Sequence, residues 1–335
     1  MAERVLASIQ TVLAKKPIEG ADFLEQITVM GWNLVAMKDE FQVGDYCCFF
    51  EVDSVLPELP EFEFMAKHKY RVKTVKLRGT LSQGLAMPLS ILKKFNSQQF
   101  TIQEGLDITE LLGVKKWEPA AVWYKALQAK GNFPFYVPKT DETKIQSALR
   151  CLDELKGQPF YISEKVDGSS MTVSFKDGEF EVCSRNISIK DMPDNMHWNI
   201  ARKYGLPEAM AKAGTWFAFQ GELCGPKIQG NKLGLKEHDW FIFSVYDITN
   251  MKYLDSLNAM GVVERFGLKF VPVLEYGESF NYTLEELLKK AEGKYATGQQ
   301  REGIVVRPMT EMYSEKLKGR LSFKVLNNQY LLKEE

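Results

Sequence analysis

Short apolar runs separated by glycines fill about the first hundred residues of the chain. The runs at 4–12, 24–35, 45–55, 71–77 and 85–89 contain many β-branched and aromatic residues, which favour strands. Several such strands at this spacing predict a small β-barrel, and the OB type is the barrel that most often holds nucleic acid strands. Other small β domains share this periodicity, so the pattern leaves that alternative open.

The strand pattern ends near residue 115, where prolines and a glycine interrupt a run of aromatic residues. A stretch of this kind is typical of a boundary between domains. The sequence therefore predicts an OB-fold nucleic-acid-binding domain at 1–114, a connecting segment at 115–138 and a second domain at 139–335.

Strands and helices alternate in the second domain. Thr140 and Asp141 offer an N-cap to a predicted helix that Gly157 ends. Residues 195–212 have a helical pattern that Pro207 divides into two pieces. Helices are also predicted at 254–266 and 284–295, and strands at 160–162, 171–175, 179–183, 216–225, 240–248, 301–308 and 318–326. The predicted fold class is α+β, an N-terminal OB-type β-barrel followed by a domain of antiparallel sheet and helices.

Composition limits the class of protein. With 335 residues and 45% hydrophobic content, the chain can bury two sizeable cores. The five cysteines are odd in number and lack paired metal-ligand spacing, which favours free thiols in a reducing compartment. No signal region or membrane-length apolar run is evident, so we expect a soluble intracellular protein.

Charge is segregated although the formal net charge is only −1. An acidic stretch at 51–63 precedes a basic run that includes Lys69, Arg71, Lys73 and Lys76. A phosphate backbone could contact such a run, and an ordinary solvated surface has the same composition. Both interpretations stay open at this point.

Lys165 lies two residues before Asp167 and Gly168, at the edge of a predicted hairpin. A lysine acts as a covalent nucleophile only as the neutral amine, so its pKa must fall from about 10.4. On its own, a lysine beside an Asp-Gly turn is usually a solvated residue. Only downstream residues can change that interpretation.

Further charged residues follow at the ends of apolar strands. They are Asp167, Arg185, Glu222, Glu302 and Lys324. Glu222 ends a buried strand, where a carboxylate costs free energy unless it is paired or faces a cation. Carboxylates with waters between them can hold Mg²⁺, and this metal and Lys324 would favour the neutral amine of Lys165. The set fits transfer of a nucleotidyl group through a lysine-bound intermediate.

These residues fall in motifs whose order resembles that of the covalent nucleotidyltransferases, which comprise DNA ligases, RNA ligases and mRNA capping enzymes. The motifs are Glu164-Lys165-Val166-Asp167-Gly168, Ser184-Arg185-Asn186, Gly221-Glu222-Leu223, the aromatic strand Phe241 to Ile248, Glu302-Gly303-Ile304-Val305-Val306 and Ser322-Phe323-Lys324. The resemblance implies an ATP-grasp-like ligase domain. It makes a surface role for Lys165 the weaker interpretation.

Two features resemble RNA ligases in particular. Ser184-Arg185-Asn186 and the upstream Thr140-Asp141-Glu142 are similar to RNA ligase motifs. A barrel before the catalytic domain, with the chain ending soon after the fifth motif, resembles the Deinococcus-type RNA ligase clade. The resemblance implies a monomer that seals 3′-hydroxyl/5′-phosphate nicks in duplexes with RNA at the 3′-hydroxyl end, in repair or processing of RNA, and has no membrane partner.

The resemblance also assigns roles. Lys165 would attack the α-phosphorus of ATP, with Lys324 neutralising the phosphate, and AMP would then pass to a 5′-phosphate that the 3′-hydroxyl attacks. Asp167, Glu222 and Glu302 would hold hydrated Mg²⁺ or Mn²⁺. In the nucleoside pocket, Glu164 would contact the adenine edge, Phe243 or less favourably Phe241 its face, Arg185 the ribose or a phosphate, and Glu222 the ribose in addition.

Two departures from the family pattern matter. Many relatives have a lysine where this chain has Ser322, and the chain has no C-terminal OB domain to orient pyrophosphate. We therefore expect Lys144 to contact the pyrophosphate. The alternatives are a DNA ligase, a GTP-dependent capping enzyme, or a non-catalytic RNA-binding protein with a decayed pocket.

Overall fold

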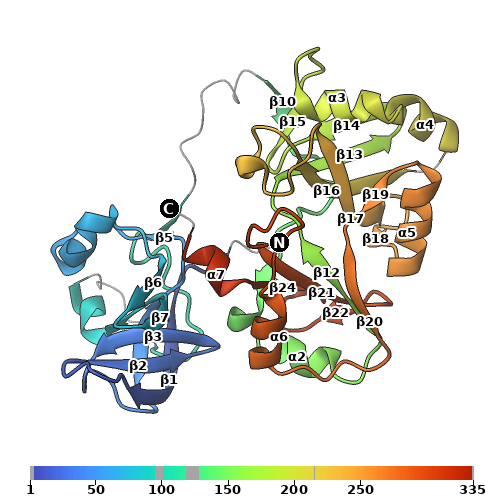
Figure 1. Cartoon of the computed structure of the whole chain (residues 1–335). Helices are drawn as coiled ribbons and strands as arrows, with labels where there is room; N and C mark the ends of the chain where they lie inside the picture. The colour runs from blue at the N-terminus through green and yellow to red at the C-terminus, as the bar shows by residue number, and fades with distance from the viewer. Residues whose placement is uncertain (1–3, 95–100, 118–127, 215, 334–335) are drawn as a thin grey trace. The chain divides into compact units, whose positions relative to one another are not determined.

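The computed structural model describes residues 4–94, 101–117, 128–214 and 216–333 (Figure 1). Contacts divide them into two compact units, residues 4–117 and residues 128–333. Within the described ranges, none of the helices has the length and apolar character needed to cross a bilayer.

The N-terminal unit is built on a five-stranded antiparallel sheet in the order β3-β2-β1-β4-β8. The strands are Trp32–Met37, Leu24–Val29, Ala7–Pro17, Tyr46–Phe50 and Leu85–Pro88. A register shift at Val12 and Ala14 bends the long β1. Cys47 and Phe49 of β4 pack in one apolar cluster and Cys48 and Phe50 in another. Because β4 is buried on both faces, its sequence is a continuous apolar run.

Smaller elements complete this unit. They are the pair β5 (Ser54–Val55) and β9 (Lys115–Lys116), the hairpin of β6 (Thr74–Leu77) and β7 (Thr80–Gln83), and the 3₁₀ helices η1 (Pro60–His68) and η2 (Leu89–Lys94).

The predicted connecting segment is shorter than 115–138. Lys115 and Lys116 pair with β5 in the N-terminal unit. Strand β10 (Ala129–Asn132) pairs with β15 in the C-terminal unit, and Val137 is buried in its core. The part between them, residues 118–127, lies outside the described residues.

Two sheets form the C-terminal unit. The first, in the order β10-β15-β14-β13-β16-β17-β18, adds Ile187–Ile189, Glu179–Cys183, Ser169–Lys176, Phe217–Cys224, Asp239–Asp247 and Lys252–Tyr253 to β10, with β19 (Lys269–Phe270) beside β17. The second, in the order β11-β24-β21-β12-β20, comprises Thr143–Lys144, Phe323–Leu326, Gly303–Pro308, Phe160–Lys165 and Val273–Gly277. A short pair, β22 (Tyr313–Ser314) and β23 (Gly319–Arg320), stands apart.

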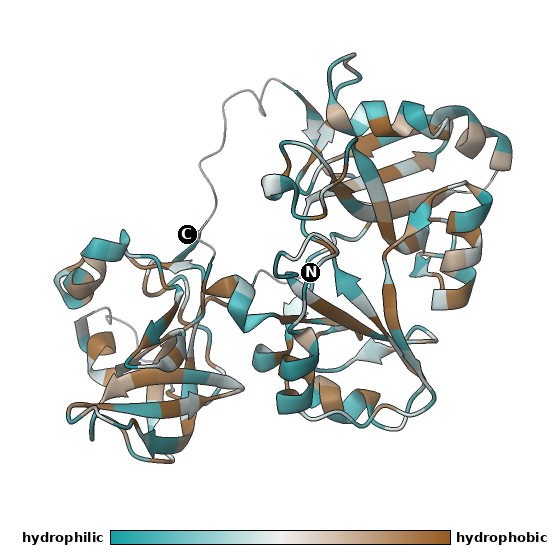
Figure 2. Ribbon diagram, viewed as in Figure 1, coloured by the Kyte–Doolittle hydropathy of each residue, from teal (hydrophilic) through white to brown (hydrophobic). Residues whose placement is uncertain are grey.

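Helices cover one face of each sheet. They are α2 (Arg150–Leu155), α3 (Met196–Lys203), α4 (Leu206–Ala213), α5 (Ser256–Arg265) and α6 (Leu284–Ala291), with η3 (Ile145–Ser147). The short helices η4 (Gln229–Asn231) and α7 (Asn328–Leu331) lie outside the apolar cores of these two sheets. Figure 1 shows α3 and α4 beside the first sheet and α2 and α6 beside the second, and Figure 2 shows brown and teal residues mixed along them. The predicted α+β fold is confirmed, and each sheet keeps one face for the site.

Two helix predictions had different outcomes, because one is confirmed and the other is wrong about where the helix begins. The division of residues 195–212 into two helices is confirmed, since α4 begins next to Pro207. The helix predicted from Thr140 begins only at Arg150, because Thr140 contacts Ser170 (3.3 Å between hydroxyl oxygens) and the chain then runs as strand β11. All five cysteines are buried free thiols, as expected.

Candidate active site

Lys165 is the last residue of β12, the second strand from one edge of the second sheet. Strand alternation places Phe160 and Ile162 in the core and Lys165 on the opposite face. Its Nζ donates to Glu302 Oε2 at 2.8 Å, and its side chain is 21% exposed. Glu302 directly precedes β21, whose Gly303 is the register partner of Lys165. Neighbouring strands therefore bring the predicted nucleophile and one predicted carboxylate together.

Carboxylates control the ionisation of Lys165. Burial alone would lower the pKa of its amine, but the negative charges of Glu302, Glu222 and Asp167 outweigh burial and raise that pKa above its usual value. The sequence prediction of a neutral amine assumed a bound cation beside these carboxylates. In this structure the ammonium of Lys165 is itself their counter-charge.

Glu222 lies on β16, opposite Ser170 of β13 and Phe241 of β17. Burial, opposed by the charge of Lys165 and joined by the charges of Glu302 and Asp167, raises the pKa of its carboxyl to about 8. A carboxyl with this pKa is largely protonated at neutral pH, and a nearby cation would restore its charge. The sequence analysis expected Glu222 at the end of a buried strand, and in the structure it is partly buried two residues before the end of β16.

Asp167 is held by two residues that the sequence analysis missed. Its Oδ2 accepts hydrogen bonds from Lys232 Nζ at 2.6 Å and from the hydroxyl of Tyr330 at 2.9 Å. Lys232 follows η4 and Tyr330 lies on α7. Neither stands in a recognisable motif, so no sequence signal could have placed them here.

The carboxylates fit a hydrated divalent cation. Among the described residues, no three His, Cys, Asp or Glu side chains converge closely enough to form a direct ligand set. The donors of Asp167, Glu222 and Glu302 are hard carboxylate oxygens, the ligand type that Mg²⁺ takes, often through water. Burial raises the pKa of the Glu222 carboxyl, and a bound cation would oppose that shift.

A basic pair borders the same sheet face. Strand β11 runs parallel to β24 with Lys144 and Lys324 as register partners, and Lys324 is in turn the partner of Val305 on β21. Partners in register project to the same side of a sheet, opposite the buried Phe323. Two predicted phosphate ligands, which came from distant motifs, are therefore neighbours.

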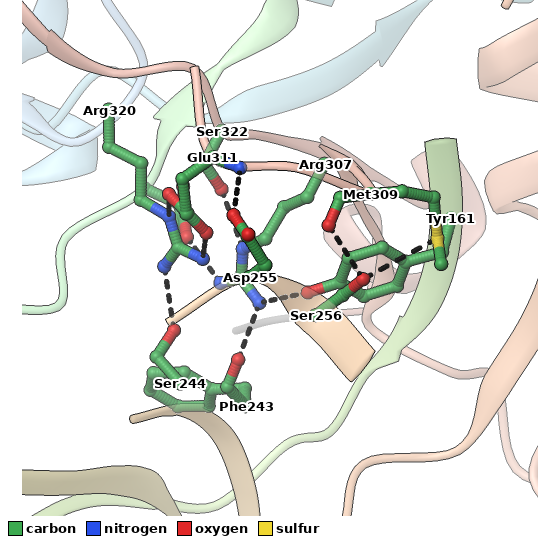
Figure 3. Close-up of polar contacts among 11 residues, drawn as sticks. Tyr161, Phe243, Ser244, Asp255, Ser256, Arg307, Met309, Glu311, Arg320 and Ser322 are labelled. Carbon is green, nitrogen blue, oxygen red and sulfur yellow. Dashed lines mark hydrogen bonds and ion pairs between the residues drawn. The ribbon is translucent and has the colours of Figure 1, made fainter. Parts of the chain in front are cut away.

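Ser322, the position where many relatives have lysine, faces a buried arginine (Figure 3). Its hydroxyl accepts from Arg307 Nε at 2.8 Å. The same guanidinium donates to the Phe243 carbonyl at 2.8 Å and to Glu142 at 2.6 Å. Arg307 was missed by the sequence analysis, although its position two residues after Val305 in an alternating strand placed it on the site face.

Phe243 sits at an irregularity of the first sheet. The β16–β17 register moves from Gln220 opposite Ser244 to Gly221 opposite Ile242, so Phe243 is an extra residue. Bulges of this kind re-aim side chains next to active sites. Phe243 and Phe241 border one apolar cluster, and the Arg307 guanidinium lies 5.6 Å from the centre of the Phe243 ring.

Glu164 does not face Lys165, whereas Arg185 lies near enough to Glu222 for its charge to oppose the raised pKa of that carboxyl. Glu164 is the register partner of Ile304, so its side chain projects to the face opposite Lys165, and burial raises the pKa of its carboxyl against the opposing charge of Arg301. Arg185 is half exposed and forms an ion pair with Asp141. The adenine-edge contact predicted for Glu164 is therefore not supported as a side-chain contact with the Lys165 face.

The predicted basic residues of the N-terminal unit differ in environment. Lys69 and Lys76 are exposed and Lys73 is half-buried. Arg71 instead pairs with Asp53 at 2.7 Å and lies over the Trp117 ring at 3.4 Å from its centre. Arg71 thus has internal partners, which do not favour the predicted role in nucleic acid binding.

Comparisons with known proteins agree with this geometry. A family model described as RNA ligase matches residues 158–326, and one described as an OB-fold domain matches residues 6–89, so the predicted OB-type fold is confirmed. No curated protein sequence matches this chain. A solved structure of Naegleria gruberi RNA ligase with pyrophosphate is 35% identical over 99% of this chain and 99% of that chain, with a TM-score of 0.89.

Two variants of that Naegleria ligase are equally similar. A lysine-to-alanine variant with ATP and Mn is 35% identical over 98% of this chain and 99% of that one, with a TM-score of 0.89. A glutamate-to-alanine variant with AMP and Mn has the same identity and TM-score over 99% of each chain. From the family model and these similarities, this chain belongs to the RNA ligase family.

Proposed function

We propose that this protein is an ATP-dependent RNA ligase of the Deinococcus-type clade. It seals 3′-hydroxyl/5′-phosphate nicks with RNA at the 3′-hydroxyl end, and it works as a monomer. The observation that carries the proposal is Lys165 beside three carboxylates, with Lys324 two strands away and Lys144 three strands away on the same sheet face. The ATP, AMP and pyrophosphate complexes of the Naegleria ligase support the choice of nucleotide.

In the first step the Lys165 amine attacks the α-phosphorus of ATP. A phosphorus–nitrogen bond forms as the bond to pyrophosphate breaks, and Lys324 offsets the charge of the α-phosphate. The amine must first lose a proton, and Glu302 Oε2 lies within hydrogen-bond distance of it. A divalent cation, Mg²⁺ or Mn²⁺, bound at Asp167, Glu222 and Glu302 supplies positive charge that offsets the triphosphate and favours the neutral amine.

The next steps pass AMP onward. The 5′-phosphate of the nick attacks the lysyl-adenylate and releases Lys165, and the RNA 3′-hydroxyl then attacks the activated phosphate and expels AMP. Lys324 stays beside the reacting phosphate in each step. Lys144 contacts the β- and γ-phosphates in the first step only, because pyrophosphate leaves there.

Aromatic and polar residues hold the nucleoside. Phe243, re-aimed by the irregularity of β17, stacks on the adenine, with Phe241 as the alternative. Arg185 reaches the ribose or a phosphate by exchanging its exposed ion pair with Asp141. Glu222 contacts the ribose in addition to its role at the metal.

The test is incubation of the purified protein with Mg²⁺ and α-labelled ATP or GTP in parallel, followed by denaturing electrophoresis. We expect label from ATP alone, its loss in Lys165→Ala and its retention in Lys176→Ala, a control lysine at the end of β13. The label should pass to a 5′-phosphate nick with an RNA 3′ end and be sealed there. Label from GTP would indicate a capping enzyme, sealing of DNA 3′ ends would indicate a DNA ligase, and no label would favour an RNA-binding protein.

A further inference from the structure

Residues 138–144, here called the inter-sheet segment, contact both sheets of the C-terminal unit. On the first sheet, Gln220 Nε2 donates to the carbonyl of Pro138 at 2.7 Å. Thr140 lies 3.3 Å from the Ser170 hydroxyl, and Asp141 pairs with Arg185. The start of the segment is therefore fixed to strands β13 and β16 and to the loop after β14.

The end of the segment is fixed to the second sheet. Glu142 accepts from Arg307 at 2.6 Å, and Thr143 and Lys144 then pair with Phe323 and Lys324 as strand β11. This strand is only two residues long, so few backbone hydrogen bonds hold it. The Glu142–Arg307 ion pair is the strong contact next to it.

Arg307 is almost completely enclosed, with 2% of its side chain exposed, and Glu142 is 18% exposed. The Arg307 guanidinium donates to Ser322 and to the Phe243 carbonyl, and its NH1 lies 3.5 Å from the Tyr161 hydroxyl (Figure 3). The same guanidinium donates to Glu142. These partners come from both sheets. Arg307 therefore connects β12, the strand of Lys165, with Phe243 of the proposed nucleoside pocket and with the segment that carries Lys144.

We propose that Arg307 and Glu142 are a positioning pair, which fixes the inter-sheet segment so that Lys144 projects beside Lys324 toward the β- and γ-phosphates of ATP. The inference rests on the proposed function, because it assigns Lys144 to phosphates that only the first step contains. Lysine is a point charge on a flexible stem, so its backbone must be held in place for it to act at one phosphate. Ser322 belongs to the same device, because a lysine there would place a second cation against Arg307.

The pair is tested in the full-length chain by separating the first step from the last. Lysyl-AMP formation is measured in a single turnover against ATP concentration, and sealing of a pre-adenylylated nick is measured without ATP. The variants are Glu142→Gln, Arg307→Lys, Lys144→Ala and the double variant Glu142→Gln/Lys144→Ala. Glu275→Gln is the matched control, because Glu275 of β20 forms a comparable ion pair with Lys290 (26% of the Glu275 side chain is exposed).

We expect Glu142→Gln, Arg307→Lys and Lys144→Ala each to raise the ATP concentration needed for half-maximal rate by about tenfold, while sealing of the pre-adenylylated nick changes by less than about threefold. The double variant should be no worse than Lys144→Ala alone, because both changes remove one function. Glu275→Gln should leave the ATP dependence unchanged.

Other results would overturn the inference. Equal loss in both assays, or multiplied effects in the double variant, would mean that the pair only stabilises the fold. An unchanged ATP dependence in Lys144→Ala would mean that Lys144 does not contact the phosphates. An unchanged ATP dependence in Glu142→Gln would mean that the pair does not position Lys144. Failure of the unsubstituted protein to form lysyl-AMP would instead refute the proposed function.

Discussion

Lys165, partly buried, and Arg307, fully buried, are two cations on one sheet face. The different acidity of an ammonium and a guanidinium gives them different roles. Each has a carboxylate partner, Glu302 for the lysine and Glu142 for the arginine. A lysine can lose its proton once positive charge approaches, whereas a guanidinium stays protonated in proteins. The lysine can therefore become a nucleophile, while the arginine remains a fixed multi-donor contact.

Acid should weaken the Glu142–Arg307 contact. Burial opposes the charge of Glu142, but Arg307 and Arg320 outweigh it and hold the pKa of that carboxyl below its ordinary value of 4.5. The pair therefore stabilises the folded state fully above pH 4.5, and this contribution is lost as the pH falls through the lower folded-state pKa. We expect Glu142→Gln to cost about 3 kcal/mol of unfolding free energy at pH 7, because it leaves a buried charge unpaired.

The measurement is urea unfolding of the unsubstituted protein and of Glu142→Gln at several pH values. The stability gap between them should narrow as the pH is lowered below 4.5. A gap that stays constant with pH would mean that the ionised carboxylate of Glu142 contributes nothing.

At the level of elements, strand β21 packs closely on β24 because the first residue of β21 is a glycine, which has no side chain. A Cβ added at Gly303 would come within 2.2 Å of the Val325 carbonyl oxygen, which is strand backbone and cannot give way easily. Gly303 also faces Lys165 and follows Glu302. The close approach of β21 to β24 therefore requires glycine at the position next to Glu302.

Gly303→Ala should separate β21 from β24 and displace Glu302 from Lys165. We expect a loss of about 2 kcal/mol or more in stability, as for overpacking, and at least about a tenfold loss of lysyl-AMP formation. Gly261→Ala in α5 is the matched control, because a Cβ added at Gly261 would meet open space. This substitution should raise the free energy of unfolding by up to about 1 kcal/mol. Thermal unfolding and single-turnover labelling check both, and equal behaviour of the two variants would contradict the prediction.

At the scale of the whole molecule, the two units have separate cores, so binding of nucleic acid and reaction with ATP can be tested apart. Lys69 and Lys76 remain exposed on the N-terminal unit, whereas Arg71 has internal partners. We infer that the two exposed lysines act on the phosphate backbone and not on the chemistry.

Lys69→Ala/Lys76→Ala should weaken binding of a nicked duplex and reduce the slope of log K against log salt by about one per lysine. Lysyl-AMP formation should stay unchanged. The control is Lys16→Ala/Lys38→Ala, two exposed lysines of the same unit outside the basic run. Salt-dependent binding isotherms and ATP labelling check the prediction. It is wrong if the control variant loses as much affinity for the nicked duplex as Lys69→Ala/Lys76→Ala does, or if lysyl-AMP formation in Lys69→Ala/Lys76→Ala falls together with binding.

The sequence determined the order of the chemistry. A lysine before Asp-Gly, carboxylates at strand ends and a late lysine predicted the site, and short glycine-bounded strands predicted the barrel, because motif order and strand periodicity are local properties of the chain. The tertiary structure decided which of these residues meet. The pairing of Lys144 with Lys324, the hold of Lys232 and Tyr330 on Asp167, and the enclosure of Arg307 all join segments far apart in the chain. Sheet register and burial make those contacts, and no local pattern encodes either.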